Sequence, residues 1–305
     1  MIRTLRLSDL PGQVLTGGPK GPDLVCTRRG PPSGVGRLFL AHLVRDGLAP
    51  NRRLHALALV AGLRLLAVAT VQRRSGPRAW ELTHLRVSQE AWDSCSELLE
   101  HCSAYAATQG AERLFLRLRE DSPLTAVAHR SGFFSSVAEV VYEGQGIASS
   151  AAPAQGELRP RAPGDDHAIF RLYNATTPPQ VRSAYGLTLE QWRDAQEPLV
   201  ERPCECVWEH EGKVVALARM SRRGRAATVE ALVHPETPWA APALTDFVRR
   251  KAGPKGVVVW PTPEYQTSVS TLLKKNGFRE TARLLVLVKS MTERVRETLL
   301  VPANV

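Results

Sequence analysis

Five cysteines are the most distinctive reactive side chains of this 305-residue chain: Cys26, Cys95, Cys102, Cys204 and Cys206. An odd number, scattered along a long chain, is not the pattern of a disulfide-stapled domain. Cys95 and Cys102 are seven residues apart in a helical pattern, which predicts that they share one buried face.

Cys204 and Cys206 alternate in a pattern that predicts a strand, and His210 is the nearest possible third metal ligand. A zinc site normally uses four ligands. The sequence therefore predicts no metal site here, and we expect both cysteines to belong to the strand's packing.

Positive charge is in excess, because 40 Lys and Arg residues face 30 Asp and Glu residues, for a formal net charge of +10. Basic turns recur at 72–78 (QRRSGPR) and 221–225 (SRRGR). Such turns can bind phosphate or an RNA backbone without reading sequence. They are more often solvated loop tips, and an arginine excess can also reflect a GC-rich genome. An anionic partner, either RNA or an acidic protein, is left open.

The composition, 43% hydrophobic and 23% charged, is typical of a soluble globular protein and excludes collagen-like, disulfide-scaffold and wholly disordered chains. The N-terminal segment has no apolar core of a signal peptide. The apolar stretch 54–71 carries Arg64 and has Gly62 at its middle, so it predicts a β-hairpin rather than a membrane span. We expect a cytoplasmic protein that makes no membrane contact.

The sequence repeats itself at an offset of about 145 residues. Gly-Phe occurs at 132–133 and again at 277–278, each time after a helical pattern and before a final strand pattern. Further upstream, ELTHLRV (81–87) matches TVEALV (228–233). The shared order of predicted strands and helices indicates a tandem duplication.

The duplication predicts an N-terminal domain at 1–146, a linker at 147–156 and a C-terminal domain at 157–305. The linker is small and polar, as flexible linkers are. The second copy opens with two predicted helices, for which Asp165 and Thr188 are plausible N-caps. The first copy is too rich in Gly and Pro there, and only 37–46 looks helical.

Each half resembles a GNAT-superfamily acyltransferase domain, and the likeness covers nearly the whole chain twice. It rests on the opening IRTLRLSDLP, the hairpins around Gly62 and Gly212, a strand ending LRV or ALV before a helix, and the final strand-helix-GF-strand. The resemblance implies an α+β fold of two tandem domains, each a mixed central sheet in a three-layer α/β/α arrangement. It also implies acyl-CoA, for instance acetyl-CoA, in a cleft between the fourth and fifth strands.

In that family the pyrophosphate lies at the N-terminus of the helix after the fourth strand. The resemblance places the cofactor-binding positions at Val87, Gln89, Trp92, Val233, Thr237 and Trp239. Neither copy has the glycines typical of the family's loop, which let the backbone approach a pyrophosphate. Acidic residues stand there instead, and they repel phosphate. These departures predict lost or weakened cofactor binding. The two tryptophans can stack on adenine or simply pack on a neighbouring helix.

The family's general base is often a Glu on the fourth strand, a position that corresponds to His84 and Glu230 here. Both residue types can take a proton from an ammonium group. The alternative is a core histidine and a half-exposed surface carboxylate. The family's thiolate-protonating Tyr is replaced by Ala128 and Leu273, which cannot donate a proton. His129, one residue after Ala128, and Tyr265, at the mouth of the fifth strand, are the alternatives, and nothing else in the sequence supports either.

The expected function is that of an N-acyltransferase, which moves an acetyl or other acyl group from acyl-CoA to a small-molecule or peptide amine. We expect the activity in the C-terminal copy, because it keeps both early helices and Glu230. The alternative is a non-catalytic pseudo-acyltransferase that binds an anionic partner. The sequence does not decide between a monomer and a homodimer.

Overall fold

The computed structural model describes residues 1–6, 9, 19, 22–27, 54–145, 156–199, 201–253 and 256–291. The predicted helix at 37–46 and the linker residues 147–155 lie outside this part. The strands of the first copy are β1 (Ile2–Thr4), β2 (Leu54–Ala61), β3 (Arg64–Arg73), β4 (Ala79–Val87), β5 (Arg113–Arg119) and β6 (Phe134–Gln145). Its helices are the 3-10 turn η2 (Gln89–Ser94), α3 (Cys95–Thr108) and α4 (Leu124–Arg130).

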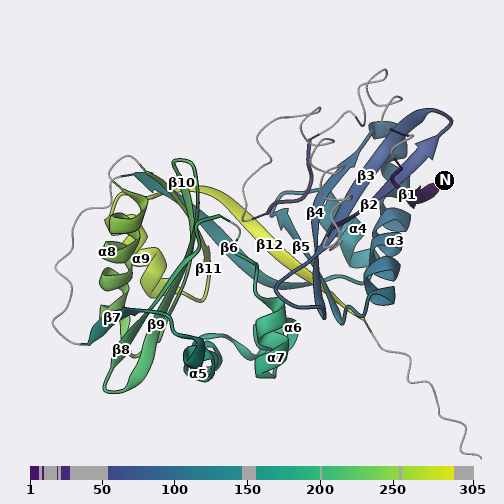
Figure 1. The fold of residues 1–305 in the computed structure, drawn as a ribbon. Helices are drawn as coiled ribbons and strands as arrows, with labels where there is room; N and C mark the ends of the chain where they lie inside the picture. Colours follow the sequence, from purple (N-terminus) through teal and green to yellow (C-terminus); the bar gives the residue numbers. More distant parts are fainter. Residues whose placement is uncertain are drawn as a thin grey trace, which may run out of the picture.

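The strands of the second copy are β7 (Glu157–Pro160), β8 (Cys204–His210), β9 (Lys213–Arg223), β10 (Ala226–Val233), β11 (Val257–Pro263) and β12 (Arg279–Ser290). Its helices are η3 (Pro163–Asp165), α5 (Asp166–Thr176), α6 (Pro179–Tyr185), α7 (Leu189–Ala195), η4 (Pro238–Ala240), α8 (Ala241–Ala252) and α9 (Thr267–Lys275). The tandem mixed α+β architecture that the sequence predicts is thus confirmed (Figure 1).

The predicted hairpins are present in both copies. β2 pairs with β3 and β8 pairs with β9, in each case antiparallel. Gly62 (φ 60°) and Gly212 (φ 70°) occupy the tight turns, where a left-handed backbone favours glycine. Cys204 and Cys206 lie on β8, as their alternation predicts.

The fourth and fifth strands of each copy pair in parallel only at their beginnings and then separate. In the first copy β4 meets β5 at 79–81 with 113–115. In the second copy β10 meets β11 at 226–228 with 257–259. Beyond these short ladders the strands diverge, so each copy has the splay that the resemblance implies.

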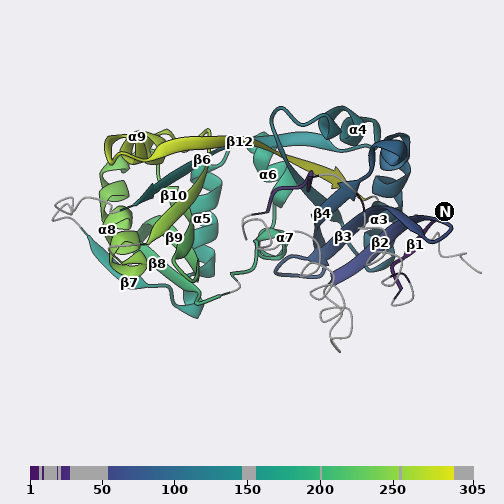
Figure 2. The same cartoon turned by 90° about the horizontal axis from the view of Figure 1, so that it is seen from above.

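The last strands of the two copies are exchanged. All twelve strands of the described chain form one sheet in the order β1-β2-β3-β4-β5-β12-β6-β11-β10-β9-β8-β7. β12 pairs with β5 of the first copy, and β6 pairs with β11 of the second. At the centre Glu139 faces Leu284, its own counterpart in the repeat, which marks a local two-fold relation. Figures 1 and 2 show both strands running from one half to the other.

Helices cover the two halves differently. α3 and α4 pack on one face of the first half, while α8 and α9 cover one face of the second half and α5 the other (Figure 1). The second copy's α6 and α7 reach across to the first half. There Ala184 and Ala195 are buried with Ala79 and Phe115. The second copy thus supplies part of the covering layer of the first.

Local details test three further predictions. Cys95 and Cys102 are both buried on α3, and burial raises the pKa of Cys102 to about 12. Thr188 caps α7, because its side chain accepts a hydrogen bond from the Gln191 amide (3.2 Å). Asp165 precedes α5 but does not cap it: its carboxylate is held by Arg159 and the Ala162 amide instead.

Candidate functional site

The cleft of the first copy is filled by the chain's own segment 22–27. The Leu24 amide donates to the Leu85 carbonyl of β4 (2.9 Å), and the Cys26 amide donates to the Arg117 carbonyl of β5 (2.8 Å). Val25, between them, is buried in the core of this half. The segment therefore bridges the two separating strands at the place where the splay would otherwise open.

We call residues 22–27 the plug. Its Asp23 contacts both the backbone of β4 and the side chain of His84. One carboxylate oxygen of Asp23 accepts from the Leu85 amide (3.0 Å), and the other lies 2.6 Å from Nδ1 of His84. The fourth-strand histidine of the first copy is thus held by a carboxylate from the segment that closes the cleft.

The cleft of the second copy is open. A cavity of about 480 Å³ lies between the beginnings of α8 and α9, beside the end of β10. Its lining residues are Thr176, Val233, Pro235, Pro238, Ala241, Pro242, Tyr265, Gln266, Thr267, Ser268, Thr271, Leu272 and Lys275. Here a single side chain spans the splay: Oε1 of the buried Gln266 accepts from the Val233 amide (3.1 Å).

A second, smaller cavity of about 80 Å³ lies between the two halves of the molecule. We call it the inner pocket; its lining residues are Val137, Glu139, Tyr173, Val181, Tyr185, Trp192, Gln196, Leu217, Arg219, Glu230, Ala231, Leu232, Pro261, Pro263 and Tyr265. Tyr265 lines both the inner pocket and the 480 Å³ cleft. The predicted base, Glu230, therefore lies in a pocket that meets the open cleft at one tyrosine.

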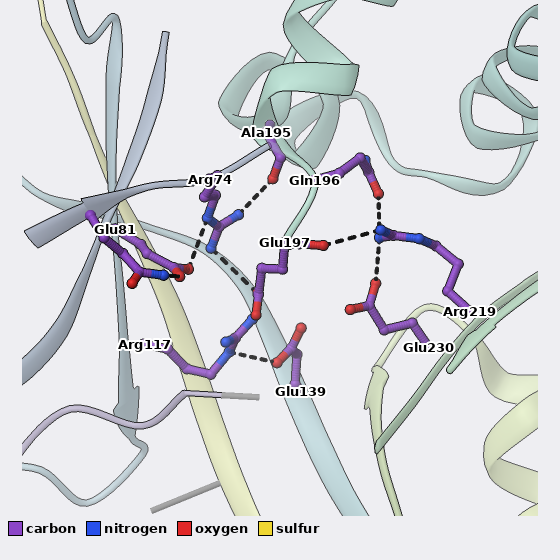
Figure 3. A network of polar contacts seen from close by, with 10 residues as sticks. Arg74, Glu81, Arg117, Glu139, Ala195, Gln196, Glu197, Arg219 and Glu230 are labelled. Atoms are coloured by element: carbon purple, nitrogen blue, oxygen red, sulfur yellow. Dashed lines mark hydrogen bonds and ion pairs between the residues drawn. The ribbon is translucent and has the colours of Figure 1, made fainter. Parts of the chain in front are cut away.

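Arg219 holds Glu230 in place (Figure 3). Its guanidinium donates to Glu230 (3.2 Å), Glu205 (2.7 Å), the Gln196 side chain (2.9 Å) and the Glu197 carbonyl (3.0 Å). The Arg219 side chain is only 9% exposed. Four of its five N–H groups are engaged in these contacts, so this cation is already committed to the protein.

The same network continues into the first half. The carboxylate of Glu197 pairs with Arg117 and Arg74, which come from β5 and the β3–β4 turn (Figure 3). Arg117 also holds Glu139 (3.0 Å), a residue that is 1% exposed. Glu139 belongs to β6 and lines the inner pocket. The first copy thus supplies a wall of the pocket that contains Glu230.

Comparison with solved structures identifies this architecture. No family model matches the sequence, and no curated protein does. A GCN5-related N-acetyltransferase from Sphaerobacter thermophilus is similar over 95% of each chain, with a TM-score of 0.54 and 15% identity. A tandem GNAT protein from the clavulanic acid biosynthesis pathway matches 96% of this chain and 99% of its own, with a TM-score of 0.52 and 16% identity.

The chain has a tandem GNAT fold. In this fold the open cavity of the second copy lies past the ends of the fourth and fifth strands, where Val233 and Gln266 line it, next to the cleft that the resemblance implies. The filled cleft of the first copy lies at the equivalent place. The two copies of the tandem GNAT fold therefore differ at the feature on which a cofactor would depend.

The positions predicted to bind the cofactor fall in different surroundings. Among the described residues, the open cleft is lined by Val233 but by neither Thr237 nor Trp239. The Thr237 amide donates a hydrogen bond to the His234 carbonyl (3.0 Å). The Trp239 and His210 rings pack edge to face, with their centroids 4.9 Å apart.

In the first copy Val87 is buried and Gln89 is exposed. The Trp92 ring packs on the core of that half. Both tryptophans thus lie against neighbouring protein.

Several residues of the site escaped the sequence-based predictions. The plug at 22–27 lies in a Gly/Pro-rich stretch with no periodicity, so no local signal marks it. Arg219 lies in a sequence with the alternating pattern of an ordinary strand. Glu139 lines the pocket only because β6 is exchanged between the copies. The sequence around neither residue predicts a place in the site.

No group of three or more His, Cys, Asp or Glu side chains within the described ranges is placed to hold a metal ion. Burial raises the pKa of the Cys206 thiol to about 12, so it stays protonated. None of the helices that the structure describes is long and apolar enough to span a membrane.

Proposed function

We propose that the C-terminal copy is an N-acyltransferase that moves an acyl group from acyl-CoA to an amine, and that the N-terminal copy binds no acyl-CoA. The observation that carries this proposal is the contrast between the clefts. The second cleft is open and meets a pocket containing Glu230, whereas the first is bridged by residues 22–27.

The residues of the open cleft fit an acyl carrier in part. Bound acyl-CoA would supply the thioester that the amine attacks. The hydroxyls of Thr267, Ser268 and Thr271 and the ammonium of Lys275 can contact its polar and anionic groups. The turn before α8 and the first turn of α8 suit a pyrophosphate less well. Pro238 in the turn and Pro242 in the helix offer no N–H, and Glu236 adds negative charge.

In this proposal Glu230 and Tyr265 carry out the two proton transfers that amide formation needs. An incoming ammonium must lose a proton, and the Glu230 carboxylate lies in the inner pocket to accept it. Tyr265, a residue that lines both the pocket and the cleft, would give a proton from its hydroxyl to a departing thiolate. Arg219 fixes the position of the Glu230 carboxylate.

Turnover of the Glu230→Gln variant tests this assignment. A glutamine keeps the size of the side chain but cannot accept the proton, so kcat should fall by about 10²-fold or more with the fold intact. The measurement is thiol release from acetyl-CoA with a panel of primary amines.

The matched control changes the equivalent residue of the other copy, His84→Gln. This variant should keep the turnover of the parent chain, since the first cleft is filled. If it loses activity while Glu230→Gln does not, the assignment of the two copies is reversed.

A second candidate is a non-catalytic binding protein with a GNAT fold. Pro238, Pro242 and Glu236, at and just before the start of α8, favour it, because they weaken an anion site. Such a protein would show no thermal shift with millimolar acetyl-CoA. If its partner is RNA, the binding constant would fall steeply as salt is added.

A further inference from the structure

The two basic turns of the repeat have different surroundings. The turn between β3 and β4 in the first copy faces α7. There Arg78 pairs with Asp194 (3.0 Å) and Glu190 (2.9 Å), which are four residues apart and therefore lie on one face of the helix. Arg74 of the same turn pairs with Glu197, just beyond α7. This chain thus contains one basic turn that is bound to an acidic helix.

The equivalent turn of the second copy, between β9 and β10, has no such cover in the part of the chain that the structure describes. Arg223 and Arg225 are exposed there, on either side of Gly224. Arg223 lies 3.6 Å from Glu201, and both of these side chains are about half exposed. Arg225 pairs with no carboxylate of the described residues. The positive charge of this turn is therefore largely open to solvent.

The C-terminal end of α8 adds to the positive surface. The Arg222 guanidinium donates to the Lys251 carbonyl (3.3 Å), which sets the turn beside the end of the helix. Arg250 and Lys251 are exposed, and within the described ranges neither pairs with a carboxylate. Cations at a helix C-terminus complement its dipole, but Arg225 lies outside the helix, so the dipole explains only part of the cluster. We call Arg223, Arg225, Arg250 and Lys251 the basic patch.

The basic patch is separate from the open cleft. The cleft lies between the beginnings of α8 and α9, whereas the patch lies at the other end of α8. The helix has 12 residues, so its two ends are about 18 Å apart at 1.5 Å per residue. A ligand that binds the patch would therefore leave the cleft free.

The shape of the basic patch favours carboxylates over a nucleic-acid backbone. Proteins that bind nucleic acid without reading sequence neutralise many phosphates along a stripe or groove. The patch is instead a compact group at one turn and one helix end, and Glu201 adds a negative charge to it. Carboxylates four residues apart on a helix are only about 6 Å apart, so a compact group of cations suits them. The β3–β4 turn shows this arrangement within the same chain.

We propose that the basic patch docks an acidic helix of a partner protein, one that presents carboxylates four residues apart on an exposed face. The cations of the patch take the part that Arg78 has on α7. This inference goes beyond the proposed function, because it requires neither acyl-CoA nor Glu230.

Fluorescence anisotropy of labelled probes, titrated with the intact protein at low salt, tests the proposal. The acidic probe is an alanine-based helical peptide of about 20 residues with three pairs of glutamates, each pair four residues apart. The comparison probes are the same peptide with glutamine for glutamate, and a single-stranded RNA with the same number of charges. The acidic peptide should bind at least about tenfold more tightly than either, and added salt should weaken it. No binding of the acidic peptide overturns the proposal, as does equal or tighter binding of the RNA.

A double charge reversal locates the binding. Arg225→Glu combined with Arg250→Glu should weaken the acidic peptide by at least about tenfold, because two attractive contacts become repulsive. The control combines Arg130→Glu on α4 with Arg171→Glu on α5, two exposed positions that give the same change in net charge. This control should bind the peptide about as well as the parent chain. Equal losses in the two variants would mean that only net charge matters, which contradicts a docking site.

Saturating acetyl-CoA separates the patch from the cleft. The acidic peptide should bind equally well with and without it, since the two sites lie at opposite ends of α8. Displacement of the peptide by acetyl-CoA would place the peptide in the cleft and overturn the proposal. A protein that binds the peptide but transfers no acyl group would keep this docking site and lose only the enzyme assignment.

Discussion

At the scale of single residues, the site depends on how one buried arginine distributes its hydrogen bonds. Arg219 joins Glu230 of β10, Glu205 of β8 and the loop after α7. In the proposed role of Glu230, a carboxylate that Arg219 already holds does not have to be oriented before it accepts a proton. This arrangement buries several charges together, and each of them is stabilised only as long as its partner is present.

Removing Arg219 should therefore destabilise the protein strongly. Arg219→Ala removes the Arg219 contact from Glu230 and from Glu205, which keeps Arg161, and from the Glu197 carbonyl, so the free energy of unfolding should fall by about 3 kcal/mol or more. The control is Arg64→Ala, which breaks an ion pair with Glu90 where both side chains are more than half exposed. That change should cost only about 0.5 kcal/mol. Urea denaturation measures both, and equal losses would mean that the network contributes no more than a surface pair.

At the scale of elements, the two halves meet through close backbone contact as well as through charge. The turn between β3 and β4 lies against the end of α7: the Ser75 amide donates to the Gln196 carbonyl (3.0 Å). Arg78 pairs with Asp194 and Glu190 of α7. One of the basic turns noted in the sequence is thus occupied by carboxylates of the other copy.

Gly76 makes this approach possible. A Cβ atom at that position would lie 1.7 Å from a carboxylate oxygen of Asp194, which Arg78 holds. Gly76→Ala should therefore lower the free energy of unfolding by about 1–3 kcal/mol, since the turn or α7 must shift.

Gly164→Ala is the matched control, because a Cβ there meets nothing within 4 Å and the backbone is not left-handed. It should be neutral or slightly stabilising. Thermal unfolding compares the two variants. A neutral Gly76→Ala would show that the turn and α7 do not pack as closely as the structure has them.

Sequence patterns predicted the elements well but not their partners. The hairpins and the Thr188 cap follow from local signals such as alternation, a turn glycine and a capping hydroxyl. The two splayed strand pairs were expected only from the resemblance to the GNAT superfamily. The strand exchange leaves no such signal. β6 and β12 are counterparts in a repeat, so either one satisfies the hydrophobic pattern of either half, and only the tertiary structure decides which is used.

At the scale of the whole molecule, the two copies of the duplicated domain differ in whether their clefts are open. Residues 22–27 fill the cleft of the first copy, and β6, Arg74 and Arg117 of that copy contribute to the site of the second. The cleft of the second copy is open, and its helices α6 and α7 pack on the first copy. The halves are therefore interdependent, and a single donor site per chain is the consequence that we expect.

Counting acetyl-CoA sites by calorimetry tests this claim most directly. We predict one site per chain. Thr271→Glu, an exposed change in the lining of the open cleft, should abolish binding, because it sets a negative charge beside an anionic ligand. Ala126→Glu, its exposed counterpart on α4, should leave binding intact. Two sites per chain, or one site that survives Thr271→Glu and disappears in Ala126→Glu, would contradict the account.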